Sequence, residues 1–145
     1  VQAYESALKI DPSNRTVLLN LSQALIEKGA YRKAEHWLRK LAVKAPQDSD
    51  TYLLLGVVYY RMGKYTRSIN AYLKALVFSS GKTGMEADIF NNLGSCYAKL
   101  GRFEEAGQAY QKALQLNPRH PKAVTNFNII TAQSFNQTTT LCLQI

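Results

Sequence analysis

The spacing of glycines and prolines limits how this sequence can fold more than any other feature. Gly29 and Gly63 are 34 residues apart, and so are Pro12 and Pro46. Each glycine follows a stretch whose apolar residues recur every three or four positions, the pattern of an amphipathic helix. Glycine tolerates the left-handed conformation that ends a helix, and proline disfavours the helical conformation in the residue before it. The sequence therefore predicts helical hairpins that stack, because one such hairpin cannot bury both of its apolar faces alone.

The clearest hairpin covers residues 90–118, with Gly101 between its two predicted helices. Gly56 and Gly94 are 38 residues apart, as are Gly63 and Gly101, so four residues are inserted between these two hairpins. We expect the insertion to lengthen the loop that joins the hairpins.

Two hairpins share one order of large and small residues. That order is Tyr52-x2-Leu55-Gly56-x2-Tyr59 with Ser68 and Tyr72 in one hairpin, and Phe90-x2-Leu93-Gly94-x2-Tyr97 with Ala106 and Tyr110 in the next. It resembles the signature of the tetratricopeptide repeat, W-x2-L-G-x2-Y…A-x3-F…P. A third copy around Leu21 is more degenerate, with Ser22 in place of the usual glycine. The resemblance covers about nine-tenths of the chain and implies an all-α fold, a right-handed α-α superhelix of helix-turn-helix repeats.

By this register, residues 1–132 form the repeat array. The array consists of a half repeat at 1–12, repeats at 15–48, 49–82 and 87–120, and a terminal helix at 121–132. The predicted helices cover residues 1–10, 14–28, 31–44, 49–62, 65–78, 85–100, 103–116 and 121–132. Ser13 or Asn14 is expected to cap the second of these helices and Asp48 the fourth. Because the chain enters in the middle of a repeat, we expect further repeats before Val1.

The repeat pattern ends after residue 132. Residues 133–145 offer no turn glycine and no second helix. The run Thr138–Thr139–Thr140 favours extended backbone, because branched side chains pack well on a pleated surface. We expect a non-repeat tail that is poorly ordered.

No combination of residues predicts catalysis, so we expect a protein that is not an enzyme, binds no cofactor or metal and has no small-molecule substrate. His36 and His120 lack the spacing and the accompanying ligands of a metal site. The letters GKT at 81–83 resemble part of a P-loop. The first glycine of that motif would fall at Leu76, within a predicted helix, and no strand precedes it.

Cysteine usage indicates the compartment. The two cysteines, Cys96 and Cys142, are too few for a disulfide framework, which fits a reducing environment. Cys96 lies beside Tyr97 in a predicted helix, where it is expected to be a small buried apolar side chain. The sequence contains no apolar run long enough to span a bilayer. We predict a cytoplasmic protein, with the nucleus and the cilium left open.

Function is expected on the surfaces of the array. The resemblance implies that the first helix of each repeat lines a concave groove, while the second helices form most of the convex side. Helical spacing assigns to the groove Asn20, Gln23, Leu53, Val57, Tyr60, Asn91, Asn92, Ser95, Lys99 and Asn126. An apolar patch flanked by amide side chains suits an extended or helical peptide of another protein. We therefore predict a protein–protein interaction scaffold or adaptor.

Asparagines recur along the predicted groove. Asn20, Asn92 and Asn126 take the equivalent position in three of four successive first helices, and Leu54 takes it in the other. Side-chain amides both donate and accept, so they can hold a peptide backbone without reading its sequence. The arrangement is similar to the asparagine ladder of O-linked N-acetylglucosamine transferases. This likeness leaves open an alternative, that the chain is the substrate-recruiting part of a larger enzyme.

Some members of the family grip the acidic C-termini of chaperones with a clamp of lysine, asparagine and arginine side chains. In this chain the corresponding positions are Leu19, Gln23, Leu54, Asp88 and Asn92. None of the five carries the side chain that the clamp needs, so we do not expect chaperone-tail binding of that kind.

The net charge of +8 is unevenly spread, and residues 51–85 contain no acidic residue. Second helices carry a set of basic residues that predicts a positive convex face: Arg32, Lys33, Arg39, Lys40, Arg67 and Lys74. Such a face can dock an acidic protein, an anionic lipid or RNA through screened electrostatics, which is a further alternative function. Charged residues on solvated helix faces are also common, and no aromatic residues alternate with these cations. We expect neither nucleic acid nor a membrane as the partner.

Overall fold

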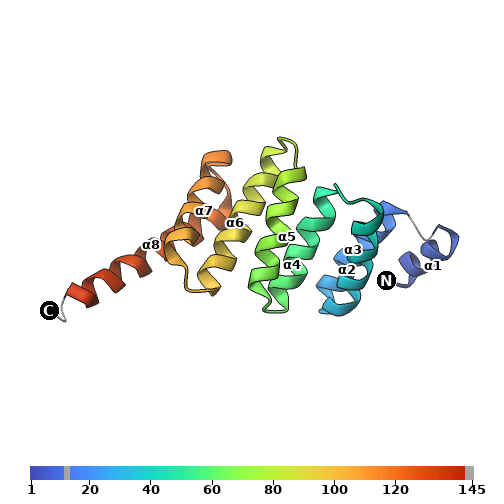
Figure 1. The fold of residues 1–145 in the computed structure, drawn as a ribbon, viewed down its shortest axis with the longest axis horizontal. Helices are drawn as coiled ribbons and strands as arrows, with labels where there is room; N and C mark the ends of the chain where they lie inside the picture. Colours follow the sequence, from blue (N-terminus) through green and yellow to red (C-terminus); the bar gives the residue numbers. More distant parts are fainter. Residues whose placement is uncertain (12–13, 143–145) are drawn as a thin grey trace. The chain divides into compact units, whose positions relative to one another are not determined.

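A computed structural model describes residues 1–11 and 14–142 of the chain, and describes side chains as far as Gln133 apart from Glu5, Leu8 and Lys9. The described residues form helices and turns, with no strand among them (Figure 1). The helices are α1 (Gln2–Ile10), α2 (Arg15–Glu27), α3 (Tyr31–Lys44), α4 (Ser49–Arg61), α5 (Tyr65–Phe78), α6 (Thr83–Lys99), α7 (Phe103–Leu116) and α8 (Pro121–Cys142). The all-α fold predicted from the sequence is confirmed.

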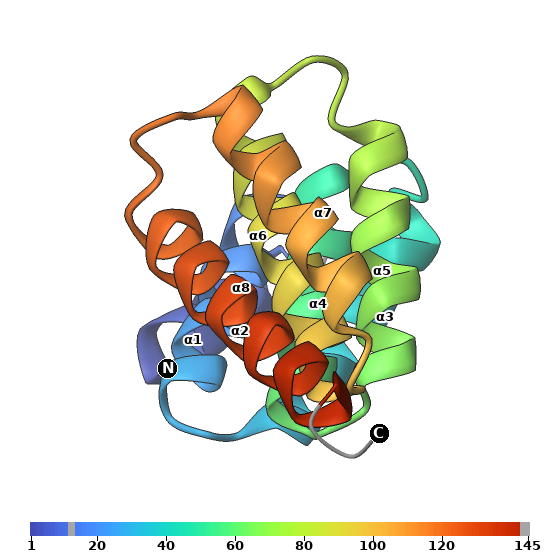
Figure 2. The same ribbon diagram turned by 90° about the vertical axis from the view of Figure 1, so that its left-hand side faces the viewer.

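The chain divides into two compact units, Val1–Phe78 and Ser79–Ile145. In the first unit, α2–α3 and α4–α5 form antiparallel hairpins, α3 packs on α4, and α2 also contacts α4. Its core is a cluster of fully or almost fully buried apolar residues that includes Leu18, Leu21, Leu38, Leu41, Leu55 and Val58. In the second unit, α8 packs against both helices of the α6–α7 hairpin (Figure 2). Buried Tyr110 and Ile130 hold that hairpin to α8.

The hairpin turns confirm the role expected of the glycines. Gly29, Gly63 and Gly101 have φ of 73°, 72° and 73°, a left-handed conformation that glycine adopts at no steric cost. In each turn the amide after the glycine donates to the carbonyl five residues earlier, at distances of 2.8, 2.8 and 2.9 Å. This bond belongs to the Schellman motif, which satisfies the last carbonyls of a helix. Three copies of one turn therefore set the hairpin geometry.

The size alternation noted in the sequence has a packing counterpart. In the second and third hairpins, a tyrosine of the second helix, Tyr72 or Tyr110, packs on the glycine of the first. In the hairpin with Ser22, the residue at the tyrosine position is the smaller Leu38, and both side chains are fully buried. Ser22 Oγ donates to the carbonyl of Leu18 at 2.7 Å, so its hydroxyl is satisfied inside its own helix. The degenerate copy thus fills the same gap with a different pair.

The helix starts agree with the predicted caps in one case and differ in the other. The side chain of Asn14 accepts a hydrogen bond from the Val17 amide at 3.1 Å and caps α2 as predicted, while the alternative cap, Ser13, lies outside the described residues. Asp48 stands at the N-cap of α4, but its side chain accepts no capping bond from the backbone. The carboxylate is occupied by two side chains instead, described below.

The inserted loop lies at the boundary between the units and is organised by one carboxylate. Ser80 and Gly81 both have positive φ, 51° and 77°. Glu86, in the first turn of α6, accepts hydrogen bonds from Ser79 Oγ at 2.7 Å and from the Gly81 amide at 3.2 Å. Since α6 begins at Thr83 rather than at residue 85, the GKT letters belong to this loop and to the helix start.

The last helix is longer than predicted. We expected the repeat helix to end at residue 132 and a poorly ordered tail to follow, yet α8 continues to Cys142. β-propensity reflects packing in a sheet more than an intrinsic backbone preference, and no strand exists among the described residues to pair with. The helical hydrogen bonds satisfy the backbone instead. Residues 143–145 of the predicted tail lie outside the described residues.

Candidate functional site

In the first unit, the predicted groove residues come from two helices in contact, α2 and α4. Asn20 and Gln23 of α2 are exposed, and Gln23 Nε2 donates to Glu27 Oε1 at 3.1 Å. On α4, three side chains are half-buried, so each keeps part of its surface accessible: Leu53, Val57 and Tyr60. The ring of Tyr60 meets that of Tyr65 edge to face, with 5.5 Å between centroids. The result is a partly accessible apolar strip beside exposed amides.

In the second unit, the predicted groove residues divide into buried and accessible ones. Asn91 is only 3% exposed, which corrects its assignment to the groove surface. Its Oδ1 accepts from Asn126 Nδ2 at 3.0 Å, and its Nδ2 donates to Asn92 Oδ1 at 3.4 Å. Helical spacing placed Asn91 within one face but could not show that α8 covers it. Its amide joins α6 to α8.

The other four groove candidates of α6 and α8 keep accessible surface. Asn92 and Asn126 are half-buried, and Lys99 is exposed. Of the asparagine ladder, Asn20 is open to solvent, whereas Asn126 already uses its amide hydrogens on α6. Ser95 is half-buried and hydrogen-bonded twice, to the Asn91 carbonyl at 3.1 Å and from the Tyr110 hydroxyl at 3.3 Å.

A histidine that sequence reasoning dismissed has a defined structural role. His120 is 5% exposed and stands immediately before α8. Its Nδ1 accepts from the Ala123 amide at 3.1 Å, and its Nε2 lies 2.9 Å from Asp88 Oδ1. In this arrangement the proton is on Nε2, which donates to the carboxylate. A histidine just before a proline at the first helical position was the available signal.

An ion-pair cluster joins the starts of α2 and α4. Arg15 lies 2.6 Å from Asp48 Oδ1 and 2.5 Å from Asp50 Oδ2, and Thr51 Oγ1 donates to Asp48 Oδ2 at 2.5 Å. Burial raises the pKa of the Asp48 carboxyl, but the hydrogen bonds from Arg15 and Thr51 outweigh it and hold that pKa below its ordinary value. The charges are far apart in sequence, so spacing alone did not reveal the cluster.

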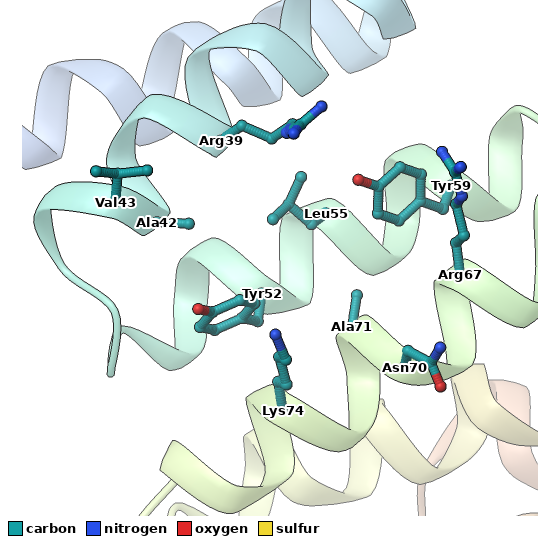
Figure 3. Close-up of a pocket in the computed structure, with 10 residues that line it drawn as sticks. All are labelled: Arg39, Ala42, Val43, Tyr52, Leu55, Tyr59, Arg67, Asn70, Ala71 and Lys74. Atoms are coloured by element: carbon teal, nitrogen blue, oxygen red, sulfur yellow. The ribbon is translucent and has the colours of Figure 1, made fainter.

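The side of the first unit formed by α3 and α5 carries the predicted basic residues, and all six are exposed. Between α3, α4 and α5 lies a hollow of about 560 Å³, which we call the α3–α5 hollow (Figure 3). It is lined by Arg39 and Val43 of α3, Tyr52 and Tyr59 of α4, and Arg67 and Lys74 of α5, with Leu55 and Ala71 among the remaining contacts. A second hollow of about 610 Å³ adjoins it and shares Arg39 and Val43. The sequence predicted these charges but not the hollow that they surround.

Two kinds of site are missing from the part of the chain that the structure describes. No three side chains of histidine, cysteine, aspartate or glutamate gather there to hold a metal ion. Nor does any helix there have the length and apolar character needed to cross a bilayer. Cys96 is buried, as predicted.

Comparison with known proteins decides the family. Three family models described as tetratricopeptide repeat match residues 1–55, 49–76 and 87–120. The chain belongs to the tetratricopeptide repeat family. No curated protein matches its sequence. The hairpins α2–α3, α4–α5 and α6–α7 are therefore tetratricopeptide repeats, in which α2, α4 and α6 are first helices and α3, α5 and α7 are second helices.

Solved tetratricopeptide repeat structures share the fold. The MamA protein is 26% identical to this chain, with a TM-score of 0.76. The aligned region covers 89% of this chain and 68% of the MamA chain. The Yersinia enterocolitica type III secretion chaperone SycD, solved with a peptide of the translocator YopD, is 22% identical to this chain, with a TM-score of 0.73. The aligned region covers 86% of this chain and 98% of the SycD chain. The second tetratricopeptide repeat domain of human RPAP3, solved with an HSP70 peptide, is 19% identical to this chain, with a TM-score of 0.70. The aligned region covers 77% of this chain and 90% of the RPAP3 domain.

Proposed function

We propose that the chain is a protein-interaction scaffold, not an enzyme, that binds a peptide segment of a partner protein on its first helices. In the first unit this surface is the side of α2 and α4 that carries Asn20, Gln23, Leu53, Val57 and Tyr60. In the second unit it comprises Asn92, Ser95, Lys99 and Asn126 on α6 and α8.

The packing of the first unit supports a groove on this side. The first helices α2 and α4 pack directly on each other, whereas on the opposite side the second helices α3 and α5 flank a hollow. A stack whose first helices lie closer together than its second helices curves toward the first helices. A surface that curves inward favours binding of a chain segment over binding of a flat partner.

The observation that carries the proposal is the half-buried apolar strip of α4. Leu53, Val57 and Tyr60 lie on a helix that already packs on three neighbours, α2, α3 and α5, yet they keep accessible surface. Removing this surface from water on binding would contribute about 25 cal/mol per Å² of apolar area. The exposed amide of Asn20 offers a donor and an acceptor to a peptide backbone. The peptides bound in the SycD and RPAP3 structures show that members of this family can take such a ligand.

The peptide expected here is not a chaperone tail held by a carboxylate clamp. The clamp positions Leu19 and Leu54 are apolar, and Asp88, at a position where the clamp needs a cation, is paired with His120. A carboxylate at that position would repel an acidic C-terminus. We therefore expect a segment with apolar anchors rather than one with a terminal cluster of acids.

The test is selection of linear peptides from a displayed library on the intact chain, followed by titration of the selected peptides by fluorescence anisotropy. Tyr60→Ala should weaken peptides bound by the first unit about tenfold or more, and Asn92→Ala should do the same for peptides bound by the second unit, if they remove central contacts. Gln108→Ala, on the exposed side of α7, is the matched control and should leave binding unchanged. If folded Tyr60→Ala and Asn92→Ala variants both bind the selected peptides as tightly as the original chain, the groove is not the binding site.

A further inference from the structure

The α3–α5 hollow combines a cationic rim with an apolar floor. Arg39 approaches from α3, and Arg67 and Lys74 approach from α5 (Figure 3). Between them lie Leu55 and Ala71, which are 5% and 6% exposed and form the apolar part of the floor. At the rim Val43 is 83% exposed, so it adds accessible apolar surface beside the hollow. The volume of about 560 Å³ lies within the range of known ligand sites.

The cations of the rim lack compensating acids. Arg39 and Arg67 have no ion-pair partner among the residues that the structure describes, and residues 51–85 contain no acidic side chain. One carboxylate, Glu35, lines the adjoining hollow and accepts a hydrogen bond from the Tyr59 hydroxyl at 3.3 Å. Cations that outnumber the acids around a hollow in this way favour an anionic occupant.

The charges of Arg39 and Arg67 both affect one side chain of the hollow, Tyr59. Burial raises the pKa of Tyr59, and Glu35 adds to this increase, while the charges of Arg39 and Arg67 both oppose it. Both arginines also line the same hollow, from different helices, so one ligand in it can meet both (Figure 3). Lys74 contributes from the other end, where its Nζ lies 5.4 Å from the centre of the Tyr52 ring.

We propose that the α3–α5 hollow is a second protein-binding site, which takes an acidic segment of a partner protein that carries an apolar side chain. The carboxylates of the segment would pair with Arg39, Arg67 and Lys74, and guanidinium groups bind carboxylates with two parallel hydrogen bonds. The apolar side chain would cover Leu55 and Ala71. None of the groove residues lines the hollow, so this site does not depend on the groove proposal.

The shape of the hollow favours a peptide over an anionic membrane or RNA. Lipid head groups form a flat surface. Such a surface would contact the cations of the rim but would not reach the apolar floor of the hollow. RNA bound without base pairing relies on open aromatic faces for stacking. The ring of Tyr52 is already engaged, because Lys74 lies over it and the ring of Phe78 packs against it with 5.9 Å between centroids.

The experiment measures binding of a fluorescein-labelled peptide of alternating glutamate and aspartate with one central leucine to the intact chain by fluorescence anisotropy. The double variant Arg39→Glu with Arg67→Glu should weaken binding at least about tenfold, since it replaces attraction by repulsion. The control pair, Lys112→Glu with Lys122→Glu, changes the net charge equally at exposed sites of the other unit and should change affinity little. Circular dichroism melting verifies that both proteins are folded.

Two further arms test the apolar component and the competing ligands. A peptide with serine in place of leucine, and the Val43→Ser variant, should each bind more weakly. Tyr60→Ala should not affect this peptide, which separates the hollow from the groove. The proposal is overturned if both charge-reversed pairs weaken the peptide equally, or if leucine and serine peptides bind alike. It is also overturned if phosphatidylserine vesicles or oligouridine bind through Arg39 and Arg67 while the peptide does not.

Discussion

The ring of Tyr72 lies so close to the backbone of Gly56 that a Cβ added at Gly56 would stand 2.3 Å from Tyr72 Cε1. The next hairpin repeats the relationship, with 2.6 Å between a Cβ at Gly94 and Tyr110 Cε1. Both tyrosines are buried, at 2% and 4% exposure, so neither ring can move aside without disturbing the core. The glycines therefore act by letting two helices approach, not by turning the chain.

Replacing this glycine should destabilise the protein. For Gly56→Ala we expect the free energy of unfolding to fall by about 1–3 kcal/mol, the usual effect of overpacking a filled core. Urea denaturation followed by circular dichroism measures it. Gly84→Ala is the matched control, because a Cβ there meets no atom within 4 Å and a helix prefers alanine. Equal stability of Gly56→Ala and the original chain would show that the second hairpin is loosely packed.

The Arg15–Asp48 pair should make stability depend on pH. Because the pKa of Asp48 is lower in the folded chain than its ordinary value of about 3.9, the pair stabilises the fold above that pH. The stabilisation is lost as the pH falls through the folded pKa. Arg15 is 47% exposed, so solvent screening keeps the contribution to about 1 kcal/mol or less.

Denaturation of Asp48→Asn at pH 7 and at pH 3 tests this dependence. The variant should be less stable than the original chain at pH 7, and the difference should shrink at pH 3. Glu104→Gln, which removes an exposed carboxylate of α7, serves as the control for net charge. A difference that stays constant between the two pH values would mean that the carboxylate has no special interaction in the fold.

His120 should stabilise the start of α8 through its acceptor nitrogen. His120→Ala removes the bond to the Ala123 amide, and loss of a helix cap costs about 0.5–2 kcal/mol. His120→Asn restores an acceptor at the same position and should recover part of that stability. Hydrogen exchange of the first amides of α8 reports the effect locally. Equal exchange in the asparagine and alanine variants would contradict a capping role.

The Asn91–Asn126 bond should couple α6 to α8. In a double-mutant cycle of Asn91→Ala and Asn126→Ala, we expect an interaction energy of about 1 kcal/mol, since the bond is partly shielded from water. Asn20→Ala, on an exposed site of α2, should show no coupling to Asn126→Ala. Additive effects of the first pair would indicate that the two amides are satisfied independently.

The hairpins were the most predictable part of this protein. Residues 31–44, 65–78 and 103–116 have the helix bounds expected from the sequence, because each follows a turn closed by glycine. The residues of the turn determine such a helix boundary without help from tertiary contacts. The end of α8 was not predicted, for the opposite reason, since neither glycine nor proline marks it and the branched residues Thr138–Thr140 favour extended backbone.

The candidate sites were less predictable, because they depend on which neighbour covers a residue. Periodicity assigned Asn91 and Asn92 to the same face, but only the position of α8 decides that the first is buried. Arg39 and Arg67 were identified as basic and exposed, whereas the hollow beside them results from the spacing of α3 and α5. The partner of His120, Asp88, lies 32 residues away, a pairing that a single sequence does not reveal.

Glu86 gives the inserted loop its shape from the helix that follows, not from the one before. The two groups that it binds, Ser79 Oγ and the Gly81 amide, both belong to the second unit. The hydrogen bonds that shape the loop therefore lie within the second unit. If the chain were divided between Phe78 and Ser79, the contacts that shape the loop would stay together in the second unit.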